Sequence, residues 1–241
     1  MSAAPPESFY RYWTFLRMTW VKICGMTNLE DTLTAVEAGA DAVGFVFYEK
    51  SPRNITVEAA RAIVEKLPEG VEKVGVFVHK NEALICAVAD EAGLTAVQMH
   101  GDDEDPRAAD RVVGRRPILK VFPAISMNHA NPLGWAGMWD PDVVYAFLVD
   151  SGTSSKHGGT GEAFDWRASA STLEEIRRCG RLVLAGGLAP VNVARAIGIL
   201  KPWGVDVVSG VEARPGKKDP EKVWAFVKAV READRLHVHG G

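Results

Sequence analysis

The strongest constraint in this sequence is a regular alternation of short β-branched or aromatic runs with longer amphipathic stretches, beginning near residue 20. Strands that alternate with helices at this spacing pair in parallel, because each helix returns the chain to the start of the next strand. Eight such units of about 25–30 residues each make a (β/α)8 barrel of ordinary length. The alternation therefore predicts an α/β fold, a single-domain TIM barrel.

The predicted elements can be given as residue ranges. Strands are expected at Trp20–Cys24, Ala42–Phe47, Lys73–Val78, Thr95–Gln98, Ile118–Phe122, Ala146–Asp150, Leu182–Ala185 and Asp206–Val208. Helices are expected at Leu29–Ala38, Val57–Leu67, Glu82–Ala92, Pro106–Val113, Pro132–Met138, Trp166–Cys179, Val191–Leu200 and Pro220–Ala233. An open doubly wound sheet is the alternative, but it usually has fewer strands, and its nucleotide-binding pattern GxGxxG is absent from the sequence.

The chain divides into an N-terminal extension (residues 1–19), the barrel (20–235) and a flexible tail (236–241). The extension holds several aromatic residues, among them Tyr10, Tyr12, Trp13 and Phe15, but no helical or strand period, and arginines interrupt the apolar stretch that a signal peptide needs. We expect it to be disordered, or to result from a start codon upstream of Met18. The alternative is an aromatic arm that packs on the barrel or on a second subunit.

Composition excludes several classes of protein. The formal net charge of -3 and the pI of about 6.1 argue against a nucleic-acid-binding surface. No apolar run approaches the roughly 20 residues that span a bilayer, so we expect no membrane partner. The three cysteines have no CxxC spacing, which argues against disulfides or structural zinc and indicates a reduced, cytoplasmic protein. No metal site and no cofactor are expected.

In a barrel of this type the active site lies at the carboxyl ends of the strands. The residues that fall there are Cys24, Ser51–Arg53, His79, His100, Lys120, Asp150, Gly186–Gly187 and Ser209–Gly210. They include one thiol, one carboxylate, several cations and several glycines. We therefore take the candidate catalytic and binding residues from this set.

Glycine clusters follow the last three predicted strands, at 158–161, 186–187 and 209–211. Glycine lets backbone N–H groups approach an anion, and barrels frequently bind phosphate after strands seven and eight. A single Gly pair would indicate only a tight turn, but three neighbouring clusters favour a phosphate site. The predicted phosphate-binding residues are Gly159, Thr160, Gly161, Gly186, Gly187, Ser209 and Gly210.

Cys24 and Asp150 are the predicted catalytic pair. Cys24 ends the first strand, and Lys22 lies two residues earlier on the same face, where its charge is expected to lower the thiol's pKa. Asp150 ends the sixth strand after an apolar run, where a carboxylate needs a partner or a role. A base and an acid on opposite sides of the barrel mouth suit proton transfer.

Four cationic or titratable side chains are predicted to contact the substrate: Lys22, Arg53, His100 and Lys120. Arg53 can form a forked pair with a substrate carboxylate, but a solvated loop arginine is an equally good interpretation. His100 and Lys120 are expected either to touch the substrate or to support residues that do.

With these residues placed, the sequence resembles the phosphoribosylanthranilate isomerase family of tryptophan biosynthesis. The resemblance runs from about residue 20 to 233, and the order and spacing of its segments together are specific. The segments are Val21–Thr27, Gly39–Phe45, Ser51–Arg53, Val74–Val78, Val97–Gly101, Leu148–Ser151, Gly158–Gly161, Phe164–Trp166, Leu184–Leu188 and Ser209–Glu212.

The resemblance implies a cofactor-free Amadori rearrangement of N-(5-phosphoribosyl)anthranilate to a 1-deoxyribulose 5-phosphate. It implies that Asp150 is the general acid for ring opening and that Cys24 is the general base that removes the C2′ proton. It also implies that Arg53 holds the anthranilate carboxylate and that the glycine loops hold the phosphate. The only partner expected is this small-molecule substrate, with the chain a monomer or a weak homodimer.

Three rivals remain. The histidine-pathway isomerase runs the same rearrangement but is expected to carry Asp in place of Cys24. Indole-glycerol-phosphate synthase would need more lysine and glutamate at the strand ends than this chain has. A non-catalytic sensor of phosphorylated ligands would not need to keep Cys24 and Asp150. An isomerisation assay separates them.

Overall fold

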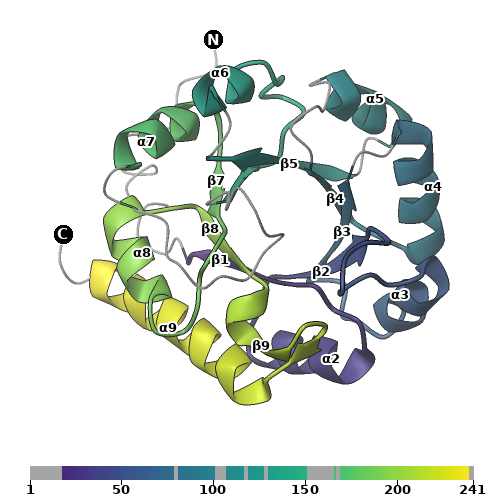
Figure 1. Ribbon diagram of the computed structural model, residues 1–241, viewed down its shortest axis with the longest axis horizontal. Coiled ribbons are helices and arrows are strands. Elements are labelled where there is room, and N and C mark those ends of the chain that lie inside the picture. The colour runs from purple at the N-terminus through teal and green to yellow at the C-terminus, as the bar shows by residue number, and fades with distance from the viewer. Residues whose placement is uncertain are drawn as a thin grey trace, which may run out of the picture.

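The computed structural model describes residues 18–78, 81–100, 107–116, 119–127, 130–150, 166 and 169–238. Its centre is a closed barrel of eight parallel strands in sequence order, with the last strand paired back to the first (Figure 1). The predicted TIM barrel is therefore confirmed. The strands are β1 (Trp20–Cys24), β2 (Ala42–Phe47), β3 (Glu72–Val78), β4 (Ala96–His100), β5 (Lys120–Ser126), β6 (Phe147–Asp150), β7 (Leu182–Leu184) and β8 (Gly204–Val207).

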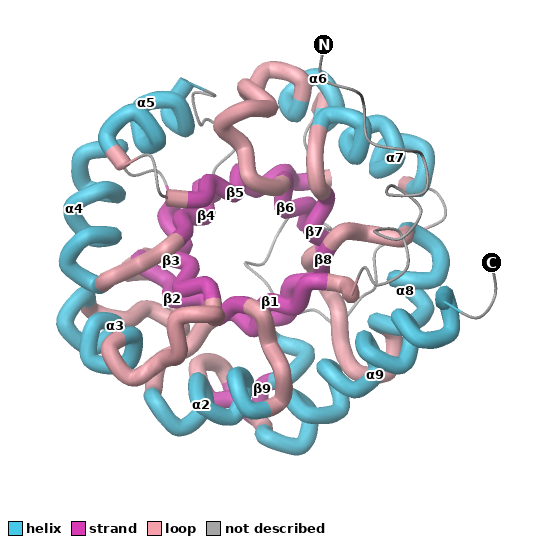
Figure 2. Tube along the Cα trace, turned by 180° about the vertical axis from the view of Figure 1, so that it is seen from behind, coloured by secondary structure: helices cyan, strands magenta, loops and turns pink. Residues whose placement is uncertain are grey.

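Helices surround this ring on the outside, as Figure 2 shows from behind. They cover the outward faces of the strands, so the main apolar core lies between the strand ring and the helix ring. The helices are α2 (Leu29–Glu37), α3 (Val57–Val64), α4 (Glu82–Ala92), α5 (Arg107–Arg115), α6 (Pro132–Ala136), α7 (Ala170–Cys179), α8 (Val193–Leu200) and α9 (Pro220–Val238).

A 3-10 turn, η1 (Ser209–Val211), and a short antiparallel hairpin, β9 (Glu212–Arg214) and β10 (Lys217–Lys218), connect β8 to α9. The sequence analysis did not predict this hairpin, because its strands are too short to show a period. In Figure 1 it lies beside α2, at the edge of the barrel nearest β1.

Local capping explains several element boundaries. The side chains of Asn28 and Thr56 accept hydrogen bonds from the backbone N–H groups of Asp31 and Ala59, which fixes the starts of α2 and α3. Gly93 ends α4 in the left-handed conformation, with φ of 69°. The predictions for β1, β2 and α4 match the observed bounds.

The fifth strand differs most from its prediction. It was expected at Ile118–Phe122 but runs from Lys120 to Ser126. Proline lacks a backbone N–H and is ordinarily found at strand edges or ends, yet Pro123 lies inside β5. It is tolerated because pairing with β6 begins only one residue later, at Ala124 and Leu148. Compared with the prediction, β5 lies a few residues closer to the C-terminus.

At both ends of the barrel the structure also differs from the predicted bounds. Thr19 was assigned to the extension, but it is buried, and its hydroxyl donates a 2.5 Å hydrogen bond to Asp234 of α9. Helix α9 was predicted to end at Ala233, with a flexible tail from residue 236. It continues to Val238, beyond the predicted end. Most of residues 1–19, and the last residues of the tail, lie outside the described part of the chain.

The interior of the barrel is closed at its amino-terminal end by stacked aromatic rings. Trp20 lies with its ring centroid 5.6 Å from that of Phe122 and 5.2 Å from that of Trp203. Small and branched apolar side chains fill the space around them. This plug leaves the opposite, carboxyl-terminal mouth as the open end of the barrel.

None of the helices in the described ranges has both the length and the apolar character that crossing a membrane requires.

Candidate active site

A polar layer lies inside the barrel between the aromatic plug and the open mouth. Lys22 of β1 is buried, and its Nζ donates to Asp206 Oδ1 of β8 at 2.9 Å and to Gln98 Oε1 of β4 at 3.0 Å. Burial alone would lower the pKa of Lys22, but Asp206 and Cys24 together outweigh it and the pKa is raised. Lys22 is therefore a fixed cation inside the barrel.

Cys24 lies one layer above Lys22, because side chains two residues apart on a strand share a face. Cys24 is 4% exposed and packs with Val46 and Val76. Gly44, the register partner of Cys24 on β2, leaves room for both side chains: a Cβ there would lie 2.6 Å from Cys24 Sγ and 3.1 Å from Lys22 Cε. The strand thus holds the thiol against the ammonium group.

The sequence predicts a lowered pKa for Cys24, but the pKa is raised because the thiol is buried. Desolvation raises the pKa of the thiol, and the cations Lys22 and Lys218 only partly oppose this, so the net direction is upward. The sequence analysis identified the cation but could not measure how completely the thiol is enclosed.

Arg53 is not a solvated loop residue. Its Nε and Nη2 donate to the two carboxylate oxygens of Glu212 at 2.9 and 2.7 Å, and both side chains are nearly buried. The aliphatic part of the Arg53 side chain packs over Gly25, which directly follows Cys24. A Cβ on Gly25 would lie 3.0 Å from Arg53 Cδ. Arg53 is therefore held beside the thiol by a forked ion pair.

Asp150 and His100 both lie at the mouth. Asp150 ends β6 and is in register with Ser126, and His100 ends β4 and is in register with Ala124. Asp150 is partly exposed and His100 is exposed, so both side chains reach toward solvent at the carboxyl ends of their strands. Their placement agrees with the ends that the sequence analysis assigned them.

The loops after β7 and β8 meet at the mouth. Gly186 and Gly187 have φ of 80° and 65°, which favours glycine, and Asn192 holds the loop by donating to the Gly187 carbonyl at 2.9 Å. Gly210 packs directly on the other loop, where a Cβ would overlap the carbonyl oxygen of Leu188. These glycines, with the adjacent Ser209, form one compact turn region suited to an anion. Gly159, Thr160, Gly161 and His79 lie outside the described residues.

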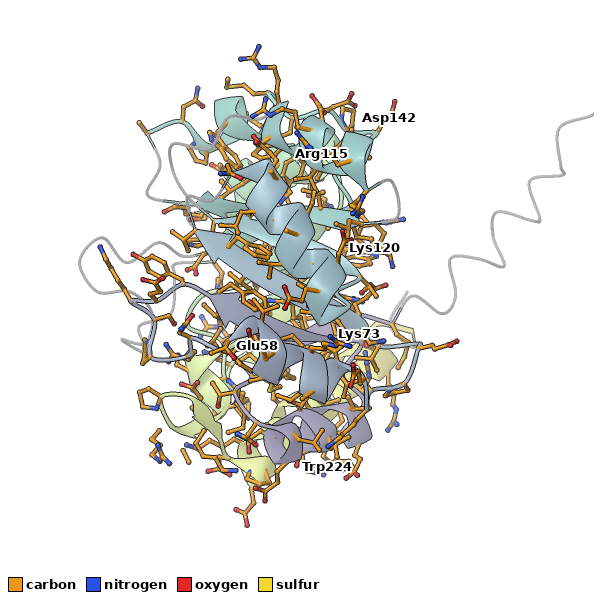
Figure 3. All side chains as sticks on the ribbon, turned by 90° about the vertical axis from the view of Figure 1, so that its right-hand side faces the viewer. Glu58, Lys73, Arg115, Lys120, Asp142 and Trp224 are labelled. Carbon is orange, nitrogen blue, oxygen red and sulfur yellow. The ribbon has the colours of Figure 1, made fainter. Side chains whose placement is uncertain are left out.

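Lys120 does not lie at the mouth. It is the first residue of β5, opposite the carboxyl end, and pairs with Glu72 at the start of β3. Its Nζ also lies 4.7 Å from the ring centroid of Tyr145. Figure 3 shows Lys120 and Lys73 along the same edge of the molecule. Lys120 was expected at the carboxyl end of its strand, but it lies at the amino end, because β5 starts where the strand was expected to be near its end.

The sequence analysis missed four polar residues near the thiol: Gln98, Asp206, Glu212 and Lys218. Asp206 and Gln98 each interrupt an apolar strand, at 204–208 and 96–99, and such a buried polar residue signals a partner. Lys218 and Glu212 lie on the unpredicted hairpin, so no period marked them.

Among the described residues, no group of three or more His, Cys, Asp or Glu side chains could hold a metal ion.

Comparison with known proteins connects this geometry to a family. Residues 21–229 match the family described as N-(5'phosphoribosyl)anthranilate (PRA) isomerase. The chain is 50% identical over 215 residues to the N-(5'-phosphoribosyl)anthranilate isomerase of Citrifermentans bemidjiense, covering 89% of this chain and 98% of that protein.

Solved structures agree. A structure of monomers of the dimeric phosphoribosylanthranilate isomerase of Thermotoga maritima is similar with a TM-score of 0.75 and 40% identity, covering 89% of this chain and 100% of that one. A phosphoribosyl anthranilate isomerase in complex with reduced 1-(o-carboxyphenylamino)-1-deoxyribulose 5-phosphate is similar with a TM-score of 0.74 and 40% identity, with the same two coverages.

Proposed function

Because the chain belongs to the N-(5'-phosphoribosyl)anthranilate isomerase family, we propose that Cys24 is its general base and Asp150 its general acid. The enzyme converts N-(5'-phosphoribosyl)anthranilate to 1-(2-carboxyphenylamino)-1-deoxyribulose 5-phosphate in tryptophan biosynthesis. The observation that carries the assignment of roles is the enclosed thiol of Cys24 next to two ammonium groups at the barrel mouth.

The proposed sequence of steps begins at Asp150. Its carboxyl group donates a proton to the furanose ring oxygen, the C1′–O bond breaks, and the nitrogen lone pair forms a protonated Schiff base. Cys24 as thiolate then removes the proton from C2′, and the electrons of that C–H bond neutralise the Schiff base to give an enolamine. Tautomerisation gives the keto product, so protons and electrons balance without an outside oxidant.

Two further groups are proposed to bind the ends of the substrate. The loops around Gly186, Gly187, Ser209 and Gly210 bind the phosphate, because they meet at the mouth and barrels commonly bind phosphate there. Arg53 binds the anthranilate carboxylate, although two of its N–H groups already bind Glu212, so it would offer its remaining donors.

The proposed roles are tested by Cys24→Ser and Asp150→Asn in an assay with N-(5'-phosphoribosyl)anthranilate. Serine is a far weaker base, so kcat should fall by about 10²–10⁴-fold while KM changes little. The carboxamide of the Asp150→Asn variant has no carboxyl proton to donate, so activity should be nearly lost at every pH. The unsubstituted enzyme should show a bell-shaped pH profile of kcat/KM, because the base must be unprotonated and the acid protonated.

Cys86→Ser is the matched control, since that thiol is buried inside α4, away from the mouth, and turnover should survive its loss. Substantial turnover in Cys24→Ser would assign the base elsewhere, and substantial turnover in Asp150→Asn would make His100 the next candidate for the acid.

Two broader properties are also proposed. The chain is a monomer or a weak homodimer, which light scattering over a range of concentrations measures directly. A cytoplasmic location is supported by its three free cysteines.

A further inference from the structure

Lys218 is a second buried lysine beside Cys24, and the steps proposed above do not use it. It lies on β10, 194 residues from Cys24 in sequence, and its side chain is 1% exposed. Burying an ammonium group is unfavourable unless it is paired and hydrogen-bonded. The groups that bind the Lys218 ammonium therefore indicate why this side chain is buried.

Three acceptors surround the Lys218 Nζ. It donates to the carbonyl oxygen of Cys24 at 2.6 Å, to the carbonyl oxygen of Val208 at 3.2 Å and to Glu212 Oε1 at 3.3 Å. A neutral amine has only two N–H donors, whereas an ammonium has three. Burial lowers the pKa of Lys218, and the charge of Glu212 opposes this. The three acceptors match the charged form, and they join the end of β1 to the end of β8.

The charges near Cys24 do not cancel. Lys22, Arg53 and Lys218 are cations, and Asp206 and Glu212 are carboxylates paired with them. Three positive and two negative charges leave one net positive charge beside the thiol. Farther out, Lys217 of the hairpin pairs with Asp31 of α2. A Cys24 thiolate would neutralise the excess charge, which a thiol would leave uncompensated.

We propose that Lys218 is a positioning residue for the isomerase reaction, which fixes the backbone of Cys24 and supplies the positive charge that favours its thiolate. The inference rests on the proposed role of Cys24. Glu212 belongs to the same arrangement, because its carboxylate accepts from both Lys218 and Arg53. It therefore links Cys24, the proposed base, to Arg53, the predicted carboxylate-binding residue.

The direction of each effect follows from charge. Without Lys218 the buried thiolate loses a neighbouring cation, so its pKa should rise. Without the negative charge of Glu212 the same thiolate faces a larger net positive charge, so its pKa should fall. The charges of Lys22, Asp206 and Arg53, on β1, β8 and the loop after β2, stay in place in both variants. A purely structural role predicts no such opposite pair of shifts.

The experiment measures the ionisation of Cys24 directly in the full chain. The ultraviolet absorbance of the thiolate is followed against pH, as the difference between each protein and its Cys24→Ser counterpart. Lys218→Met should raise the midpoint by about one pH unit or more and shift the thiol-dependent limb of kcat/KM in the same direction. Glu212→Gln should lower the midpoint.

Lys217→Met is the matched control. Lys217 lies next in sequence on the same strand, but its ammonium binds Asp31 and Glu30 and is one-third exposed. Its loss should leave the midpoint and the pH profile unchanged. A shift as large as that of Lys218→Met would show that disturbing the hairpin, not the charge, is responsible, and would overturn the inference.

An unchanged midpoint in Lys218→Met would also overturn it. If that variant does not fold, Glu212→Gln decides the matter, since a midpoint that stays or rises there contradicts the charge argument. Failure of the proposed function is a separate result: turnover by Cys24→Ser would remove Cys24 as base whatever its titration shows.

Discussion

At the scale of the single residue, three lysines of this chain show how strongly location decides role. Lys22 is enclosed in the barrel and pairs with Asp206, and Lys218 is enclosed in the hairpin and binds the Cys24 carbonyl. Lys120 pairs with Glu72 at the opposite end of the strands. All three are lysines paired with a carboxylate, and only the first two lie close enough to influence the thiol.

A glycine at the mouth gives a prediction at this scale. Gly210→Ala should displace the loop after β7 or β8, because the new Cβ would overlap the Leu188 carbonyl and backbone cannot yield as a flexible side chain does. Since both loops are proposed to bind the phosphate, KM should rise at least about tenfold, with a smaller change in kcat.

Gly198→Ala is the matched control in steady-state assays, because Gly198 lies inside α8 with open space around its missing Cβ. Its KM should equal that of the unsubstituted enzyme. An unchanged KM in Gly210→Ala would place the phosphate away from these loops.

At the scale of the element, the β9–β10 hairpin is held to α2 by a buried carboxylate. Asp31, in the first turn of α2, accepts from the Lys218 backbone N–H at 2.7 Å, from Lys217 Nζ at 2.6 Å and from Asn28 Nδ2 at 2.9 Å. A helix N-terminus also favours a negative charge. A segment too short to fold alone is thereby fixed beside the active site.

This anchor predicts a pH dependence of stability. Burial alone would raise the pKa of Asp31, but the hydrogen bonds from Lys217, Lys218 and Asn28 outweigh it, so the pKa is lowered. A lowered pKa gives stability that is fully present above the unfolded value of about 4 and is lost as pH falls through the folded value. Asp31→Asn should therefore be less stable than the parent at neutral pH, with the gap closing below about pH 4.

Denaturant unfolding at a series of pH values measures this gap. Glu30→Gln is the control, since Glu30 is the neighbouring acid, is exposed, and binds the same Lys217. Its effect on the free energy of unfolding should be small throughout. A gap for Asp31→Asn that does not change with pH would mean that the carboxylate stabilises the fold by packing and not by charge.

At the scale of the whole molecule, closure of the barrel brings the two ends of the described chain together. β1 pairs with β8, and Thr19 donates through its backbone N–H and its hydroxyl to Asp234. Arg231 completes the junction by donating to the Thr19 carbonyl at 2.5 Å. The barrel is thus fastened at Thr19, at the start of the described part of the chain.

A chain that starts at Met18 should therefore fold and turn over like the full-length protein. A chain that starts at Trp20 should be less stable, because removing Thr19 leaves Asp234 without two partly buried hydrogen bonds, at a cost of about 1–3 kcal/mol. Thermal unfolding and kcat/KM of the three proteins check this. Loss of folding on removal of residues 1–17 would instead support an N-terminal arm that packs on the barrel.

Local pattern was sufficient for much of this protein. Alternating hydrophobicity is imposed by the period of each element, so all eight strands, and the placement of Cys24 and Asp150 at strand ends, could be predicted from the sequence. Capping is equally local, since Asn28 and Thr56 each accept from a backbone N–H group three residues along the chain. The order and spacing of the motifs are sufficient to indicate the family.

The tertiary structure alone decided which charges meet. Lys22 and Asp206 are 184 residues apart, and Arg53 and Glu212 are 159 apart, so no local period connects them. The net direction of the Cys24 pKa depends on how fully neighbouring elements exclude water, which a sequence pattern does not record. Lys120 was misplaced for a related reason: a shift of a few residues along one strand moves a side chain from one mouth of the barrel toward the other. Periodicity determines the elements, whereas burial and pairing arise only when the closed barrel brings distant residues together.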